Sequence, residues 1–180
     1  MKPYFLVIRN YIKLRLYKIF VCNKMIFDKI ELLSRQTKIK LQSNSTLKLG
    51  KHIVTDGHST LIVSNGGELS IGNFVYLNEG CMISCKSKIE IGEGCKFGPG
   101  VMIFDNNHKY DMQSGVSDEH TSSPIVIGRN CWIAANAIIL KGTIIEDNCV
   151  IGAGSIVRGH VQKGSIVTNS REMIIKKMEK

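Results

Sequence analysis

Aliphatic residues recur every six positions over most of this chain. From Ile127 the sequence reads IGRNCW, IAANAI, ILKGTI, IEDNCV and IGAGSI, with Gly or Ala mostly second and a small residue fifth in each hexad. A helix would need apolar positions at 3.6-residue spacing and a single strand would need alternation, so the period indicates short strands separated by tight turns. The residues that open the hexads are Ile71, Leu77, Ile83, Ile91, Phe97, Ile103, Ile127, Ile133, Ile139, Ile145, Ile151 and, more weakly, Val157.

Three hexads make one coil of 18 residues, and successive coils stack at about 4.8 Å, the spacing between paired strands. Each aliphatic residue then points into a prism and each small residue lies at a crowded corner. This pattern predicts an all-β fold, the left-handed parallel β-helix of hexapeptide repeats, over residues 47–168. The handedness departs from the right-handed crossover rule, so the period alone carries the prediction. An ordinary β-sandwich of short strands is the alternative.

Glycine and cysteine usage agrees with this fold. Seventeen glycines and an aromatic content of 7% suit narrow corners around a thin aliphatic core. Four of the six cysteines fill the small fifth place of a hexad: Cys81, Cys95, Cys131 and Cys149. Cys131 and Cys149 are 18 residues apart, so we expect them on neighbouring coils. Their spacing matches no zinc motif, and no metal is expected. We predict buried, reduced thiols and a cytoplasmic protein.

A basic segment precedes the repeat. The net charge is +9, and residues 1–48 carry all of it, with eleven Lys or Arg against two acidic residues, whereas residues 49–180 carry thirteen of each sign. Near-helical spacing of apolar residues in this segment predicts one or two helices. These apolar residues are Phe5, Ile8, Ile12, Leu16 and Ile19. We place the boundary of this basic helical segment near Thr46, so that it covers residues 1–46.

Two interpretations of the basic segment stay open. It caps the open end of the β-helix with its apolar side, or residues 1–40 lie on an anionic membrane, which would put the protein at the inner face of the cell membrane. No charge-free run approaches the roughly 20 residues of a membrane span, and no signal cleavage site is present. Nucleic acid is not an expected partner, because the sequence has no recognised motif and no basic patch on the repeat.

The repeat breaks once. The hexad of Ile103 ends at His108, and the next in phase opens at Ile127, so residues 109–126 are expected to leave the coil as an exserted loop. A long loop in a compact domain is more often functional than incidental. His108 stands where the coil ends and the loop begins, which makes it the candidate for chemistry.

From about Ser64 to Val157 the sequence resembles the hexapeptide-repeat acetyltransferases, in the branch of sugar O-acetyltransferases that includes galactoside and maltose acetyltransferases. The stretches that carry the resemblance are LSIGNFVYLNEGC, the loop, and SPIVIGRNCWIAANAIILKGTIIEDNCVIGAGSIV. The resemblance implies transfer of an acetyl group from acetyl-CoA to a hydroxyl. It also implies a homotrimer of parallel prisms with each active site between two subunits.

The resemblance assigns roles one residue at a time. His108 matches the general base, which a sugar hydroxyl needs near neutral pH. Glu119 matches a carboxylate near that base, where it would hold the imidazole tautomer. Asn78 and Ser64 match residues that contact the acceptor. The residues that match the CoA site are Trp132, which lines the tunnel, and Ala135 and Ala153, whose backbone amides bind the thioester and pantetheine arm.

Three departures limit the carry-over. Lys86 stands where the galactoside enzymes have an acceptor-binding Asp, so that acceptor is not transferred to this chain. Arg158 and Gly159 replace a Thr-Lys pair. The Gly-Asn-Pro-Ala-Lys element near the carboxyl end is missing, and the sequence there predicts a short helix over residues 169–180. Arg158 and Lys176 are the candidates for contacts with the CoA phosphates.

The sequence therefore predicts an acetyl-CoA-dependent O-acetyltransferase that acts on a sugar or glycan precursor, for example of capsule or lipopolysaccharide. Three other functions stay open. They are a xenobiotic O-acetyltransferase, a zinc-dependent carbonic anhydrase, which would need three convergent histidines, and a non-catalytic β-helix scaffold.

Overall fold

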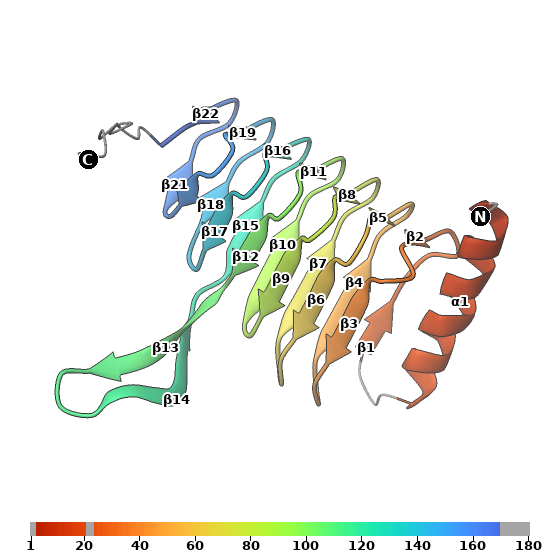
Figure 1. Ribbon diagram of the computed structural model, residues 1–180, viewed down its shortest axis with the longest axis horizontal. Helices are drawn as coiled ribbons and strands as arrows, with labels where there is room; N and C mark the ends of the chain where they lie inside the picture. The colour runs from red at the N-terminus through yellow and green to blue at the C-terminus, as the bar shows by residue number, and fades with distance from the viewer. Residues whose placement is uncertain (1–2, 21–23, 170–180) are drawn as a thin grey trace, which may run out of the picture.

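The protein is a solenoid with one helix at its amino-terminal end and one projecting hairpin (Figure 1). The computed structural model describes residues 3–20 and 24–169. Helix α1 (Pro3–Phe20) comes first, and the strands that follow wind into coils with one strand on each of three faces. The predicted carboxyl-terminal helix and Lys176 fall within residues 170–180, outside the described residues.

Twenty strands form three parallel sheets, one for each face of the prism. Sheet A contains β1 (Lys24–Ile26), β4 (Thr46–Leu49), β7 (Glu68–Ile71), β10 (Lys88–Ile91), β15 (Ile125–Ile127), β18 (Ile144–Ile145) and β21 (His160–Val161). Sheet B contains β2 (Leu32–Leu33), β5 (Val54–Thr55), β8 (Tyr76–Leu77), β11 (Lys96–Phe97), β16 (Trp132–Ile133), β19 (Val150–Ile151) and β22 (Ile166–Val167). Sheet C contains β3 (Lys38–Leu41), β6 (Thr60–Val63), β9 (Met82–Cys85), β12 (Met102–Phe104), β17 (Ile138–Leu140) and β20 (Ile156–Val157).

The hexad phase is confirmed. Every residue predicted to open a hexad is buried, from Ile71 at 2% exposed to Val157 at 4%. These residues stack on one another from coil to coil, as in the register Ile91 with Ile127 and Ile127 with Ile145. Cys95, Cys131 and Cys149 form one such interior column, because the strands that follow them pair in register. All five described cysteines are buried and unpaired. Burial raises the pKa of the Cys81 thiol to about 11.

The boundary expected near Thr46 is wrong, because the coil begins earlier. Strand β1 already pairs in parallel with β4, and β2 and β3 pair with β5 and β6. Residues 24–41 are therefore the first coil, and only α1 precedes the β-helix. The six-residue spacing was present there, in Phe27, Leu33 and Ile39, but the coils are longer at this end. Leu49 pairs with Ile71, 22 residues later, whereas Ile127 pairs with Ile145, 18 residues later.

The extra residues gather at one corner of the prism, where the chain passes from sheet C to sheet A. We call this the C/A corner, and the corner between sheets B and C the B/C corner. In the second coil the C/A corner holds the turn at residues 64–67, which joins β6 to β7. The large interruption lies at the same corner two coils later.

The interruption is an ordered antiparallel hairpin rather than an irregular loop. Strand β13 (Asn106–Asp111) pairs with β14 (Gly115–Ser122), and the hairpin extends well away from the coils (Figure 1). It starts before the expected residue 109 and ends before residue 126, because Ile125 is fully buried and already belongs to β15.

Asp105 holds the base of the hairpin. Its side chain is fully buried, and its two carboxylate oxygens accept the backbone N–H groups of Lys86 (2.8 Å) and Ser87 (2.7 Å) from the coil below. The backbone carbonyl of Asp105 accepts the N–H of Ser123, the residue that follows the hairpin (2.9 Å). One residue thus ties both ends of the hairpin to the preceding coil.

Helix α1 caps the open end of the β-helix, but not with the side that was predicted. The first coil has no coil before it to donate N–H groups to its carbonyls, and side chains of α1 supply them. Asn10 donates to the carbonyls of Glu31 (2.8 Å) and Leu33 (3.0 Å), and Tyr17 donates to that of Ile39 (2.8 Å). The apolar row from Phe5 to Ile19 faces outward instead.

Glu31 is the buried titratable group under this cap. It is 1% exposed, one carboxylate oxygen accepts the backbone N–H of Ile53 (2.9 Å), and the other, Oε1, has no hydrogen-bond partner in the structure. Burial raises the pKa of the Glu31 carboxyl from 4.5 to about 8.

We predict that the protein loses stability as the pH rises from about 5 to about 8. In this window the folded state keeps a proton on Glu31 that the unfolded state has released, so the free energy of unfolding falls with pH. Glu31→Gln still accepts the Ile53 N–H and has no proton to lose, so its stability should vary less over this window. Denaturant unfolding of both proteins, with exposed Glu68→Gln as the control, measures the difference. Parallel pH profiles for all three would contradict the prediction.

The second prediction concerns the base of the hairpin. In Asp105→Asn an amide nitrogen replaces one acceptor oxygen and leaves a backbone N–H unsatisfied, so the free energy of unfolding should fall by about 1–3 kcal/mol. Asp118→Asn, on the exposed part of β14, is the matched control and should unfold like the parent. Equal denaturant midpoints for the two variants would remove the anchoring role of Asp105.

Candidate functional site

His108 lies on the hairpin just beyond its base, and its ring lines a cavity. In β13 it pairs with His120 of β14, and the two rings lie 4.0 Å apart between centroids. The Nδ1 atom lies 3.1 Å from the carbonyl oxygen of Ser117. A carbonyl can only accept, so Nδ1 carries the hydrogen in this bond and Nε2 of the neutral ring keeps its lone pair. This tautomer is the one that a general base working through Nε2 requires.

The expected contact between His108 and Glu119 is absent, because another group takes the carboxylate. Glu119 is exposed and forms an ion pair with Lys109, with 2.5 Å between Nζ and Oε2. Lys109 also holds the pKa of the Glu119 carboxyl below its usual value. The backbone of Ser117 therefore fills the orienting role that the sequence suggested for a side chain. A backbone acceptor leaves no signal in the sequence.

An open cavity of about 410 Å³ lies between the hairpin and the C/A corner of the later coils. His108 and Arg158 both line it, as predicted residues that the fold brings together. Lys141, which sequence reasoning missed, lines it as well, one coil before Arg158. With Lys109 these residues place three cationic side chains beside the imidazole, which suits a ligand that carries phosphate or carboxylate groups.

Four other predicted residues lie on the far side of sheet C, at or beside the B/C corner. Backbone hydrogen bonds run from coil to coil along this corner, from Asn78 through Gly98 and Ala134 to Gly152. Ala135 and Ala153 are the next residues of the last two coils, and Trp132 precedes the corner on sheet B, where its side chain is 55% exposed. Sheet C thus separates these residues from His108 within one chain.

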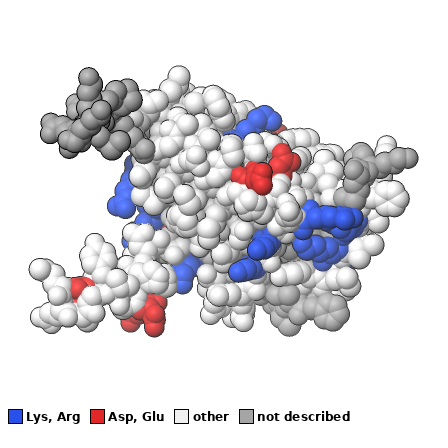
Figure 2. Space-filling model, viewed as in Figure 1, with Lys and Arg blue, Asp and Glu red and all other residues white. Residues whose placement is uncertain are grey.

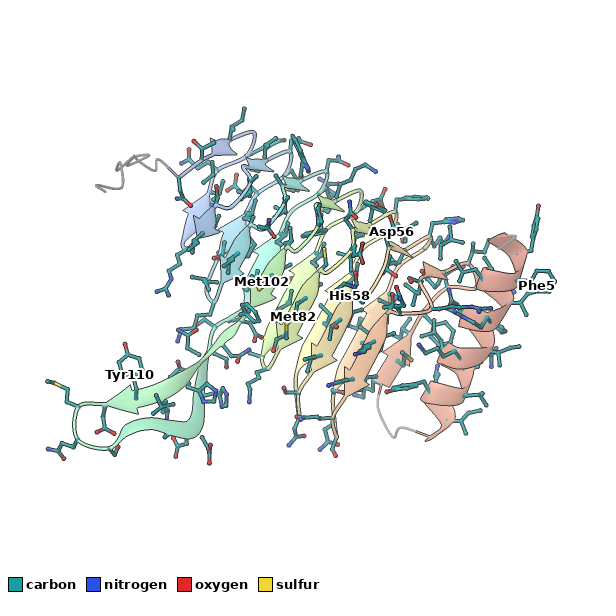
Figure 3. The ribbon with its side chains drawn as sticks, in the orientation of Figure 1. Phe5, Asp56, His58, Met82, Met102 and Tyr110 are labelled. Atoms are coloured by element: carbon teal, nitrogen blue, oxygen red, sulfur yellow. The ribbon has the colours of Figure 1, made fainter. Side chains whose placement is uncertain are left out.

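Ser64 lies on the C/A corner with His108, but two coils earlier. Its backbone N–H donates to the carbonyl of Cys85 (2.8 Å), and the next residue of that coil, Lys86, in turn donates to Asp105. Ser64, Lys86 and the base of the hairpin form one line along the corner. Figure 3 shows the two edges of sheet C, with Asp56 and His58 at the B/C corner and Tyr110 on the hairpin beyond the other edge.

No three His, Cys, Asp or Glu side chains come together in a way that could hold a metal ion within residues 3–20 and 24–169. His108 and His120 are adjacent, whereas His52 and His58 belong to the second coil and His160 to sheet A.

Comparison with known proteins agrees with the geometry. Residues 124–159 match the family described as bacterial transferase hexapeptide (six repeats). A putative lipopolysaccharide biosynthesis O-acetyl transferase of Escherichia coli, WbbJ, is 27% identical over 76% of this chain and 74% of its own length. The galactoside O-acetyltransferase of Escherichia coli is 36% identical over 52% of this chain and 46% of its length. The chain spans less than two thirds of the length of this and other curated relatives.

Solved structures share the fold. A hexapeptide-repeat acetyltransferase of Vibrio cholerae, in complex with acetyl coenzyme A, superposes with a TM-score of 0.57 at 23% identity, over 65% of this chain and 63% of the other. AntD, an N-acyltransferase of Bacillus cereus, reaches 0.63 at 15% identity over 91% and 89%. The coil is the left-handed parallel β-helix that the hexads predicted. The repeat, the three-sheet coil and these relatives together place the chain in the hexapeptide-repeat acetyltransferase family.

Proposed function

We propose that this protein transfers an acetyl group from acetyl-CoA to a hydroxyl group of a sugar or glycan precursor. The observation that carries the proposal is the hydrogen bond from His108 Nδ1 to the Ser117 carbonyl, beside a cationic cavity at the one break in the repeat. It fixes the tautomer in which Nε2 takes the proton of the attacking hydroxyl. The new C–O bond then forms as the C–S bond of the thioester breaks, and the proton passes from His108 to the CoA sulfur.

The donor is held by two groups of residues in this proposal. Arg158, with Lys141 beside it, meets phosphates of CoA, because both side chains line the cavity next to His108. Trp132, Ala135 and Ala153 contact the pantetheine arm, and the backbone amides of the two alanines stabilise the oxyanion. Support comes from the small size of these alanines and the exposure of Trp132 beside them, which leave room for an extended cofactor along the corner. Lys176 stays a candidate for the phosphates.

Asn78 and Ser64 contact the acceptor. A glycan precursor is favoured over a free sugar by the relative WbbJ, whose name refers to lipopolysaccharide biosynthesis. The basic amino-terminal end favours an acceptor near an anionic membrane, and we place the enzyme in the cytoplasm at the inner face of that membrane. Reduced, buried cysteines agree with this compartment.

A second copy of the chain completes the site. The proposed residues lie along both edges of sheet C, too far apart to meet in one chain, since five strand residues already span roughly 16 Å. The outer face of sheet C is apolar across four coils, where Met82, Met102, Ile138 and Ile156 stand in register. Figure 3 shows Met82 and Met102 side by side on this face. A trimer would bring the B/C corner of one subunit to the hairpin of the next.

The third prediction is that His108→Ala lowers the rate of acetyl transfer by roughly 10²–10⁴, the usual contribution of a general base. The side chain is exposed, so the fold should be retained. The rate is measured as free CoA released in the presence of a glycan acceptor. His120→Phe keeps a ring beside His108 and serves as the matched control.

The companion variant Glu119→Gln should stay within about fivefold of the parent, because an exposed ion pair contributes about 1 kcal/mol or less. If His108→Ala kept more than about a third of the activity, far above the loss expected of a base, the proposed role of His108 would be wrong. A large loss in His120→Phe with little in His108→Ala would move that role to His120.

The fourth prediction concerns assembly. Ile138→Glu places a charge on the apolar outer face of sheet C and should convert trimers to monomers, because a charge buried in an interface without a partner is strongly unfavourable. Val126→Glu makes the same change on the outer face of sheet A and should leave the trimer intact. Sedimentation velocity separates the two species. Identical profiles for both variants would exclude sheet C as the interface.

A further inference from the structure

The outward face of α1 carries a continuous row of exposed apolar side chains. Their exposed fractions lie between 49% and 78%, and Phe5 points away from the coils in Figure 3. The row consists of Tyr4, Phe5, Ile8, Ile12, Leu16 and Ile19. It lies opposite the buried side of the helix, where Asn10 and Leu14 meet the first coil. An apolar face of this length contributes nothing to the cap, so it is available for something outside the chain.

Cations flank the row. Helix α1 has Arg9, Lys13, Arg15 and Lys18 and no acidic residue. Beside the helix a groove of about 290 Å³ is lined by apolar side chains of the first coil and by Tyr11, Arg15, Lys18 and Lys29. Figure 2 shows Lys and Arg side chains gathered at the helix end of the molecule.

These cations are not neutralised by carboxylates among residues 3–20 and 24–169. No ion pair there involves Arg15, Lys18 or Lys29. The guanidinium of Arg15 instead donates to the Tyr11 hydroxyl (2.8 and 3.1 Å) and lies over its ring. The carboxylate of Asp28 accepts the backbone N–H of Lys29 (2.6 Å). The groove therefore keeps an excess of positive charge next to the apolar row.

We propose that α1 lies on the surface of an anionic lipid bilayer, with its apolar row at the boundary of the acyl chains and Arg15, Lys18 and Lys29 against lipid phosphates. An interfacial helix needs both features on one side, an apolar face and a basic border. A second copy of the chain is a poorer occupant, because two α1 helices packed face to face would bring like charges together with no acid to offset them. The helix does not cross the bilayer: none in the described part of the chain is sufficiently long and apolar to do so.

The test is sedimentation of the full-length protein with vesicles of phosphatidylcholine containing a quarter phosphatidylglycerol, at low and high salt. Ile8→Ser/Ile12→Ser should weaken binding about tenfold, since it removes exposed apolar area without touching the cap. Its matched control is Ile144→Ser/Ile166→Ser, two exposed isoleucines on later coils. Lys18→Gln/Lys29→Gln should weaken binding about 25-fold, roughly fivefold for each charge removed. Its control is Lys96→Gln/Lys163→Gln, which changes two exposed lysines far from α1.

Three results would overturn the proposal. They are no sedimentation with anionic vesicles at low salt, equal binding to vesicles of phosphatidylcholine alone, and losses in the control pairs as large as those in the α1 pairs. Sedimentation velocity without lipid covers the other occupant. If Ile8→Ser/Ile12→Ser dissociates an assembly there, the face binds a second copy and the lipid proposal is wrong. None of these readouts depends on acetyl transfer, so the proposed reaction stands or fails separately.

Discussion

The ladder of backbone hydrogen bonds between successive coils is the interaction on which the rest of this structure depends. Each coil donates its N–H groups to the next and accepts from the previous one, so the three faces must stay in register from α1 to β22. Extra residues can leave only at a corner without breaking a sheet, and the hairpin leaves at the C/A corner. The first coil lacks a donor coil, which is why Asn10 and Tyr17 face inward from α1.

The same ladder explains what the sequence could predict. Residues in register must all be small or all aliphatic, so the hexads from Ile71 to Val157 carried a periodic signal that gave the fold. In the first two coils the corner turns are longer, and the period from Phe27 to Leu61 was hidden by the change of phase. The helix was foreseen, but not its orientation, because its apolar residues occur on both sides and the demand of open carbonyls for donors is not visible in one sequence.

The candidate site divides in the same way. His108 could be found because it stands at the only break among the repeats, and Arg158 reached the same cavity through the register of β17 and β20. The partner of His108 could not be found, since the acceptor is the backbone of Ser117 and the expected carboxylate, Glu119, pairs with Lys109. Asp105 also passed unnoticed as an anchor, because its role depends on two amides from the coil below.

The separation of Asn78 and His108 by sheet C gives the account its central claim, that each site is shared between two copies of the chain. Mixing the two inactive variants His108→Ala and Asn78→Ala tests it directly. After joint refolding, random assembly should restore about a quarter of the parent activity, because one site in four combines an intact His108 corner with an intact Asn78 corner from its neighbour. If the mixture stays as inactive as either variant alone, although mixed assemblies form, both residues act within one chain and the claim is wrong.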